Sequence, residues 1–258
     1  MLFRSETKEE LFRFLDPRML RRTKAQVLPQ LPPKTYSTRL VEMSAKQRKA
    51  YEQIRKEMMA QLEGGTLIAA NPLTKLTRML QFASCYGEIN EADQLLLTLP
   101  SCKVDALLEI VEEVGDETAV IFAESKQLID LATAALMKEK YRVGTITGAV
   151  DAQTRAERVG QFNERRLQFL TVTLGAGGEG LSFPGCTTAV FLQRSFNFIL
   201  NAQAEDRIHG LGRGSETAAS QIIDIITRDS LEARVHAVYR ENAENLEAIV
   251  RDEETLKA

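Results

Sequence analysis

TAVIFAESKQLIDLATAALMKEKYRVGTIT, residues 118–147, is the stretch that decides the fold. Its first six residues, 118–123, form a short apolar run that is typical of a buried strand. Residues 126–139 predict a helix, because four apolar side chains recur on one face: Leu128, Ile129, Ala132 and Leu136. A second strand is expected at 141–147. Strands joined by a helix of this length need a crossover connection, so the two strands are predicted to be parallel.

The same alternation continues toward the C-terminus. Further strands are predicted at 168–173, 188–193 and 221–227, and further helices at 151–163, 198–209 and 230–251. Ser101 and Asp151 are placed to cap helices. The sequence therefore predicts an α/β fold, in which a parallel sheet carries helices on both faces. Ligands of such sheets bind where the strands end, and those ends carry Lys126, Gly148, Thr173 and Arg194.

The first hundred residues have a different pattern, which is helical and interrupted by proline. Ser44 and Gln47 have the spacing of a capping box, which predicts a helix over about 45–62. A second helix is expected after Asn71-Pro72, and Pro32-Pro33 favours an extended connector before the pair. We therefore predict a helical extension in residues 1–100 that precedes the sheet domain in residues 101–258.

Charge is unevenly distributed along the chain. Lys and Arg number 33 and Asp and Glu 36, so the net charge is −3, which excludes a uniformly basic nucleic-acid coat. Between residues 18 and 56, however, eleven basic residues stand against two acidic ones, a local balance of 11 − 2 = +9. This segment is either a solvated helical face or a surface that contacts phosphates.

Several classes of protein and site are not supported by the sequence. No apolar stretch approaches the roughly 18 residues of a membrane span, so no membrane partner is expected. Two histidines and no CxxC or HExxH motif leave no predicted metal site. Three cysteines far apart in the sequence indicate reduced thiols and a cytoplasmic protein.

Residues 175–180, GAGGEG, follow a predicted strand and match G-x-G-x-x-G. A dinucleotide fingerprint requires a helix at the third glycine and an acidic residue about 20 positions later. Residues 181–185, LSFPG, do not continue a helix, and 196–204 contain no carboxylate. No P-loop motif occurs either, so a nucleotide site here would be half of a complete one. Taken alone, this glycine loop is interpreted as a packing turn.

Residues 203–213, QAEDRIHGLGR, are expected on and just beyond a short helix. Gln203 and Arg207 are four residues apart and share a helix face, and Gly210 and Gly212 end the helix. An arginine at a helix end beside a glycine loop favours a charge donor to a phosphoryl group. The alternative is a surface salt bridge.

Taken in series, several segments resemble the C-terminal RecA-like lobe of SWI/SNF-type DNA translocases in the second helicase superfamily. The resemblance extends over 16–227 and rests on MLRRTKAQVLPQLPPKT (19–35), MSAKQRKAYEQI (43–54), AVIFAESKQLIDLATAAL (119–136), GAVDAQTRAERVGQFNE (148–164), AGGEGLSF (176–183) and QAEDRIHGLG (203–212). The first segment resembles the linker that the family carries between its two ATPase lobes, which implies that role for the basic helical part in residues 1–100.

The resemblance implies a RecA-like sheet and an ATP site with Mg²⁺, shared with an N-terminal RecA-like lobe that lies upstream or on a partner chain. It implies catalytic roles for Gln203 and for Arg207, as an arginine finger that stabilises charge on the γ-phosphate. Contacts with the nucleotide are implied for Gly178, Gly180 and Arg213.

The resemblance also implies double-stranded DNA as a partner, and with it a cytoplasmic protein that is associated with the nucleoid or, if viral, lies in the host cytoplasm. Contacts with the DNA backbone are implied for Lys126, Gly148 and Thr173. Because such contacts recognise phosphates and not bases, binding is expected to be salt-sensitive and largely independent of sequence.

The chain departs from the family's pattern at several positions. Gly210 stands where the family has a second arginine, and Arg213 lies three residues later. Leu174 and Gly175 replace a threonine and an arginine, and Glu124 places a carboxylate at a strand end. Two hypotheses stay open: a lobe of an ATP-dependent double-stranded DNA translocase that is inactive alone, or a non-catalytic DNA-binding or scaffold module that has lost the motor. A dinucleotide-dependent oxidoreductase ranks third.

Overall fold

A computed structural model of the chain describes residues 28, 31–63, 72–90, 94–176, 181–209 and 219–237. Some predicted features lie outside these described residues, namely Gly178, Gly180, Gly210, Gly212, Arg213 and the predicted helix beyond residue 237.

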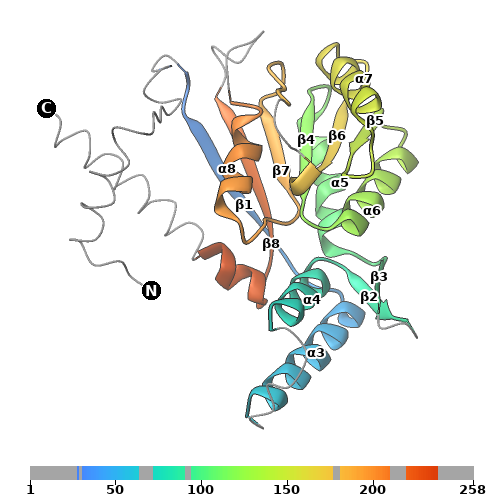
Figure 1. Ribbon diagram of the computed structural model, residues 1–258, viewed down its shortest axis with the longest axis vertical. Coiled ribbons are helices and arrows are strands. Elements are labelled where there is room, and N and C mark those ends of the chain that lie inside the picture. Colours follow the sequence, from blue (N-terminus) through green and yellow to red (C-terminus); the bar gives the residue numbers. More distant parts are fainter. Residues whose placement is uncertain are drawn as a thin grey trace, which may run out of the picture. The chain divides into compact units, whose positions relative to one another are not determined.

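Six parallel strands form the main sheet, in the order β1-β8-β7-β4-β6-β5 (Figure 1). They are β1 (Lys34–Val41), β4 (Ala119–Ala123), β5 (Val143–Ile146), β6 (Phe169–Thr173), β7 (Thr188–Phe191) and β8 (Ser220–Thr227). Every pair of neighbouring strands is parallel, which confirms the predicted sheet. Because all six strands run in one direction, they end at one edge, which we call the carboxyl edge.

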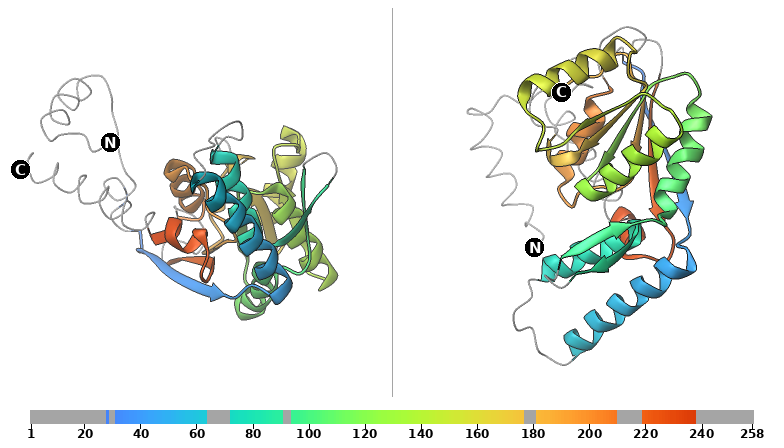
Figure 2. Two further views of the ribbon diagram at one scale, coloured as in Figure 1. Left: turned by 90° about the horizontal axis from the view of Figure 1, so that it is seen from below. Right: turned by 90° about the vertical axis from the view of Figure 1, so that its right-hand side faces the viewer.

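Helices cover both faces of this sheet, as Figure 2 shows from two further directions. They are α5 (Cys102–Val114) and α6 (Lys126–Lys138) on one face, and α7 (Ala152–Asn163) and α8 (Phe198–Asp206) on the other. Side chains of β4 alternate between the two cores. Ala119 and Ile121 lie with α5 and α6, whereas Val120 and Phe122 lie with α7 and α8.

The four helices begin at side chains that cap them. Ser101 Oγ accepts a hydrogen bond from a backbone N–H of α5 at 3.2 Å, and Asp151 Oδ1 accepts one from α7 at 2.9 Å. Both predicted caps are therefore confirmed. Ser125 and Asn197 cap α6 and α8 in the same way. Removing such a cap ordinarily costs about 1 kcal/mol.

β1 differs most from the predictions, because the sequence indicated only an extended connector there. It is an edge strand paired with β8 over its whole length, with Lys34 opposite Ser220 and Val41 opposite Thr227. Most of its side chains are exposed, so the hydrophobic pattern of a buried strand is absent from its sequence. Part of the segment 1–100 thus belongs to the same sheet as residues after 101.

The segment between β1 and α5 contains two helices and an antiparallel hairpin: α3 (Ala45–Glu63), α4 (Pro72–Ser84), β2 (Tyr86–Ile89) and β3 (Leu95–Thr98). The helices confirm the predictions, whereas no pattern in the sequence indicated the hairpin. Only half of the capping box forms. Ser44 Oγ accepts from the Gln47 N–H at 3.2 Å, but the buried Gln47 side chain donates to the carbonyls of Phe82 and Ala83, at 3.0 Å each. This residue therefore ties α3 to α4.

Candidate functional site

The three predicted DNA contacts lie together at the carboxyl edge. Lys126 begins α6 just after β4, Gly148 follows β5, and Thr173 ends β6. These three strands are neighbours in the sheet. Lys126 and Gly148 are exposed and Thr173 is buried. Lys126 Nζ lies 2.6 Å from Asp130 Oδ2, one turn further along α6. Two of the three positions are thus accessible, and contact with DNA stays a prediction for all three.

The two residues with predicted catalytic roles, Gln203 and Arg207, lie near the end of α8. Gln203 is exposed, and Arg207 ends the helix with helical backbone angles. The Arg207 side chain is half-buried, and burial lowers the pKa of its guanidinium. The ordinary pKa of an arginine lies so far above neutral that the group stays charged at neutral pH. Arg207 is therefore a partly desolvated positive charge at a helix end.

Both ends of the glycine loop are joined to this part of α8. At the exit of the loop, the Phe183 N–H donates to the Arg207 carbonyl at 2.9 Å. The buried Phe183 ring also meets Phe162 of α7 edge-on, with ring centroids 5.6 Å apart. At the start of the loop, Leu174 shares a core with Ala204 of α8. The predicted proximity of Arg207 to the glycine loop holds for these flanking residues, while the central glycines lie outside the described residues.

A network of buried charges holds the same end of α8. Arg194 follows β7, and its Nη1 lies 2.8 Å from Glu205 Oε1 in α8. Its Nε lies 2.6 Å from Asp224 Oδ1 in β8. The three side chains are 7%, 4% and 2% exposed, and a charge this deep is strongly destabilising without its partner. Arg194 also lies over the Phe191 ring, 4.0 Å from its centroid.

β1 completes the network from the edge of the sheet. Lys34 Nζ lies 3.3 Å from Glu205 Oε2 and 2.8 Å from Asp206 Oδ1. The Tyr36 hydroxyl donates to Glu205 Oε2 at 2.9 Å. Glu205 and Asp206 immediately precede Arg207 in the sequence. The two residues before the predicted finger are therefore anchored to the sheet by side chains from β1 and from the end of β7.

Asp224 extends this network to the helical residues 231–237. His236 Nε2 lies 3.1 Å from Asp224 Oδ2. Burial by itself raises the pKa of the Asp224 carboxyl, but the hydrogen bond with His236 and the charge of Arg194 outweigh burial, so the pKa is lower than its ordinary value. Asp224 is therefore an ionised carboxylate among the apolar residues 222–226 at the centre of β8.

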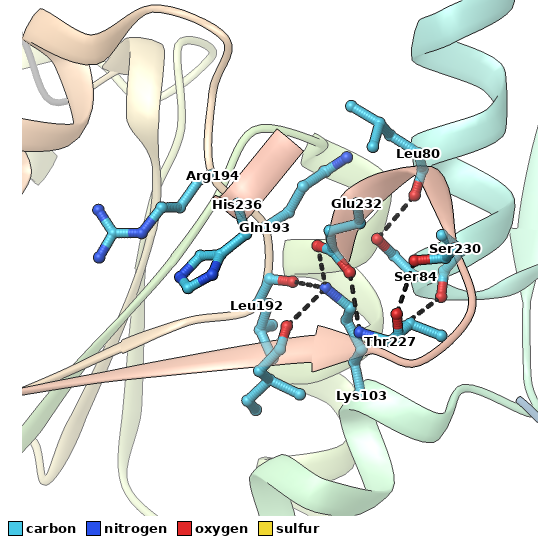
Figure 3. A network of polar contacts seen from close by, with 12 residues as sticks. Leu80, Ser84, Lys103, Leu192, Gln193, Arg194, Thr227, Ser230, Glu232 and His236 are labelled. Atoms are coloured by element: carbon cyan, nitrogen blue, oxygen red, sulfur yellow. Dashed lines mark hydrogen bonds and ion pairs between the residues drawn. The ribbon is translucent and has the colours of Figure 1, made fainter. Parts of the chain in front are cut away.

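A second buried network surrounds Lys103 of α5 (Figure 3). The Lys103 side chain is fully buried, and its Nζ donates to the Leu192 carbonyl, to the Ile225 carbonyl and to the Glu232 carboxylate. The other Glu232 oxygen accepts from the Thr227 N–H at 3.1 Å. One lysine thus joins α5, the residues that end β7 and β8, and the helix at 231–237.

Sequence reasoning missed both networks. A signal was present for Asp224, which stands alone among apolar residues in IIDII, 222–226, because a carboxylate in a buried strand needs a partner. Glu205 stood beside Arg207 in the quoted motif without being assigned a role. Lys103 carries no such signal, since a lysine in the first turn of a helix is ordinarily solvated.

Metal and membrane features are absent from the part of the chain that the structure describes. No group of three or more His, Cys, Asp or Glu residues there could hold a metal ion. None of the described helices combines the length and apolar character of a membrane span. All three cysteines are free and buried.

Comparisons of the sequence with known proteins agree with this architecture. Residues 102–213 match the helicase conserved C-terminal domain, and residues 4–94 match the SNF2-related domain. The chain is 26% identical over 252 residues to chromodomain-helicase-DNA-binding protein 1-like of Mus musculus, and 28% identical over 229 residues to DNA annealing helicase and endonuclease ZRANB3 of Bos taurus. These matches cover 94% and 86% of this chain but 27% and 20% of the relatives, so the chain spans about a quarter of the length of the curated relatives it matches.

Two solved structures share the fold. The C-terminal part of the Fun30 ATPase domain has a TM-score of 0.66 at 20% identity, over 81% of this chain and 90% of that one. The Sulfolobus solfataricus SWI2/SNF2 ATPase core in complex with dsDNA has a TM-score of 0.63 at 20% identity, over 90% of this chain and 49% of that one. At this identity the match identifies the fold, a RecA-like lobe.

Proposed function

We propose, from the premise that this chain is a C-terminal RecA-like lobe of the SWI/SNF type in helicase superfamily two, that it supplies half of an ATP-dependent double-stranded DNA translocase. Sequence matches to the SNF2-related and helicase C-terminal domains support the proposal. In this view residues 1–100 contain the linker between two ATPase lobes, and residues 101–258 together with the edge strand β1 form this lobe.

The other half of the nucleotide site is assigned to an N-terminal RecA-like lobe, in the same protein or on a partner chain. This chain has no P-loop sequence, and its described residues include no cluster of three metal-binding side chains. The partner lobe would therefore hold the triphosphate and Mg²⁺. Bound ATP supplies the γ-phosphoryl group that is transferred to water.

The contribution of this chain to hydrolysis is a positioned positive charge. Arg207 ends α8, and the preceding Glu205 and Asp206 are anchored to Arg194 and Lys34. This anchoring is the observation that carries the proposal, because a finger must move with its lobe as one body when the two lobes close. Gln203 is exposed one turn earlier and offers a hydrogen bond to the same ligand. Nucleotide contacts from Gly178, Gly180 and Arg213 stay predictions.

The contribution to DNA binding lies at the carboxyl edge. Lys126 and Gly148 are accessible there, and a lysine and a backbone N–H suit phosphate oxygens. A cycle of lobe closure and opening would then advance the duplex.

Hydrolysis by a protein that contains both lobes tests the finger. Arg207→Ala is expected to lower kcat by about a thousandfold or more, the range for an arginine finger, with the KM for ATP little changed. Arg165→Ala, a change at an exposed arginine paired with Glu117, is the matched control. An unchanged kcat in Arg207→Ala would remove the finger assignment, and robust hydrolysis by these 258 residues alone would refute the shared site.

The second candidate function is a non-catalytic DNA-binding or scaffold module. It is favoured by Gly210, which stands where the family has a second arginine. Salt-sensitive duplex binding without ATP hydrolysis, in a protein that contains both lobes, would select this alternative.

A further inference from the structure

Helix α3 has one buried face and one basic face. Gln47 and Tyr51 are buried against the rest of the protein. On the opposite side Lys46, Lys49 and Lys56 are exposed. Their spacings of three and seven residues keep them on one side of a helix. We call these three lysines the basic stripe.

The positive charge of this helix is only partly matched within the fold. The whole helix contains five basic residues and three acidic ones, a balance of 5 − 3 = +2, and its first part, residues 45–56, contains all five basic residues and only one acidic one, Glu52. Glu52 pairs with Arg55 at 3.1 Å, and Arg48 donates to backbone carbonyls of the loop after β8. The Lys46 ammonium lies over the ring of Tyr86, 3.9 Å from its centroid. The basic stripe is therefore the side of α3 on which positive side chains are exposed to solvent.

The basic stripe lies on the same side of the sheet as the predicted DNA contacts. α3 begins four residues after the carboxyl end of β1, and Figures 1 and 2 show α3 and α4 beyond that end of the sheet. Lys126 and Gly148 follow the same ends of β4 and β5. A duplex along the carboxyl edge could therefore approach α3 as well.

We propose that the basic stripe is an additional phosphate-binding surface for duplex DNA, separate from the contacts at the strand ends. This inference rests on the proposed function as a DNA-binding lobe. At about 1.5 Å per residue, the ten steps along the helix from Lys46 to Lys56 extend over about 15 Å. One DNA strand places a phosphate about every 3.4 Å along the duplex axis, so the stripe matches about four phosphates.

A duplex fits this surface better than an anionic membrane does. An interfacial helix inserts an apolar face into the lipid boundary. Among the described side chains of α3, the apolar face is already used, because Tyr51 is 1% exposed and lies in the same core as Met79 and Phe82 of α4. Positive charge without an available apolar face is typical of phosphate contacts in solution.

Binding of a fluorescent duplex of about 30 base pairs and mixed sequence, measured by anisotropy between about 50 and 200 mM salt, tests the proposal. The variant is Lys46→Gln/Lys49→Gln/Lys56→Gln in the complete 258-residue chain. The control removes three charges at the opposite edge of the sheet, as Lys138→Gln/Arg142→Gln/Arg166→Gln. The stripe variant is expected to bind at least about tenfold more weakly, and its salt slope to fall by about three, one per lost phosphate contact. The control variant should match the wild type.

The remaining results of these binding experiments each support or overturn the proposal. Lys49→Gln/Lys56→Gln keeps the contact of Lys46 with Tyr86, so a slope reduced by about two in this variant supports the proposal even if the triple variant folds poorly. Wild-type affinity and slope in both stripe variants would overturn the stripe while leaving the proposed function intact. No duplex binding by the wild-type chain would overturn both. Loss of binding to phosphatidylserine vesicles, with duplex binding unchanged, would assign the stripe to a membrane surface and overturn the proposal.

Discussion

Arg194 and Asp224 form a bidentate ion pair inside the protein, with Nε 2.6 Å from Oδ1 and Nη2 3.1 Å from Oδ2. Both side chains are almost completely buried, so each charge depends on the other for its stability. The remaining guanidinium nitrogen, Nη1, contacts Glu205 of α8. Arg194 therefore ties the end of α8 that carries Arg207 to β8, in addition to the contacts of that end with β1.

Replacing this arginine should be costly. Arg194→Met leaves two buried carboxylates without their main partner, so the free energy of unfolding is expected to fall by about 3–5 kcal/mol. Urea unfolding followed by circular dichroism measures the change. Arg165→Met is the matched control, because Arg165 and Glu117 form an exposed pair at 3.1 Å that should contribute less than about 1 kcal/mol. Equal losses in the two variants would contradict the role given to the buried network.

The contribution of Asp224 to stability should depend on pH. The pKa of its carboxyl is lower in the folded protein than the ordinary value, which is about 3.9 in an unfolded chain. Its stabilisation is therefore complete above about pH 4 and is lost as the pH falls through the folded pKa. Asp224→Asn should be less stable than the wild type in urea at about pH 7, and this difference should shrink below about pH 4. A difference that stayed constant from neutral to acid pH would contradict the assignment.

The sheet could be predicted from the sequence because each of its central strands has a recognisable local pattern. β4, β6 and β7 are short apolar runs, and capped helices lie between β4 and β6 and after β7. β1 could not be predicted as a strand, because its side chains are mostly polar and exposed. What makes it a strand is its pairing with β8, which is 220 − 34 = 186 residues away at Lys34. Pairing over such a separation leaves no local pattern in the sequence of β1.

The candidate site could be predicted only where it depends on local spacing. Helical spacing placed Gln203 and Arg207 together, and the strand ends brought Lys126 and Gly148 to one edge. The anchoring of Glu205 could not be derived, since its partner Lys34 is 171 residues away. Tertiary contacts of this kind depend on which strands pair and in which register. Local sequence patterns predict the strands but not their pairing.

The cysteines should be unreactive in the folded protein. Burial raises the pKa of Cys186 to about 11 and that of Cys85 to about 11, and burial also raises the pKa of Cys102. At pH 8 only about one in a thousand of the Cys85 and Cys186 thiols is then ionised, and the thiolate is the reactive form. Reaction with Ellman's reagent is expected to be slow in the native protein and to count three thiols in guanidinium chloride. Rapid reaction of any thiol in the native state would contradict the buried positions.

Lys103 and Glu232 should behave as one unit in a double-mutant cycle. Lys103→Met or Glu232→Leu alone leaves a buried charge unpaired, so each is expected to cost about 3–5 kcal/mol of unfolding free energy. The double variant removes both charges, so its loss of unfolding free energy should be much smaller than the sum of the two single losses. It should still be less stable than the wild type, because the carbonyls of Leu192 and Ile225 lose their donor.

Urea unfolding of the wild type, both single variants and the double variant gives the coupling energy of this pair. The exposed pair Arg55 and Glu52, one helical turn apart at 3.1 Å, is the matched cycle, with an expected coupling of only about 0.3–0.5 kcal/mol. Strong coupling for Lys103 and Glu232 would mean that the helix at 231–237 is held to α5 and to the ends of β7 and β8 by charge pairing. Additive losses would instead show that apolar packing holds this helix, with the pair making no separate contribution.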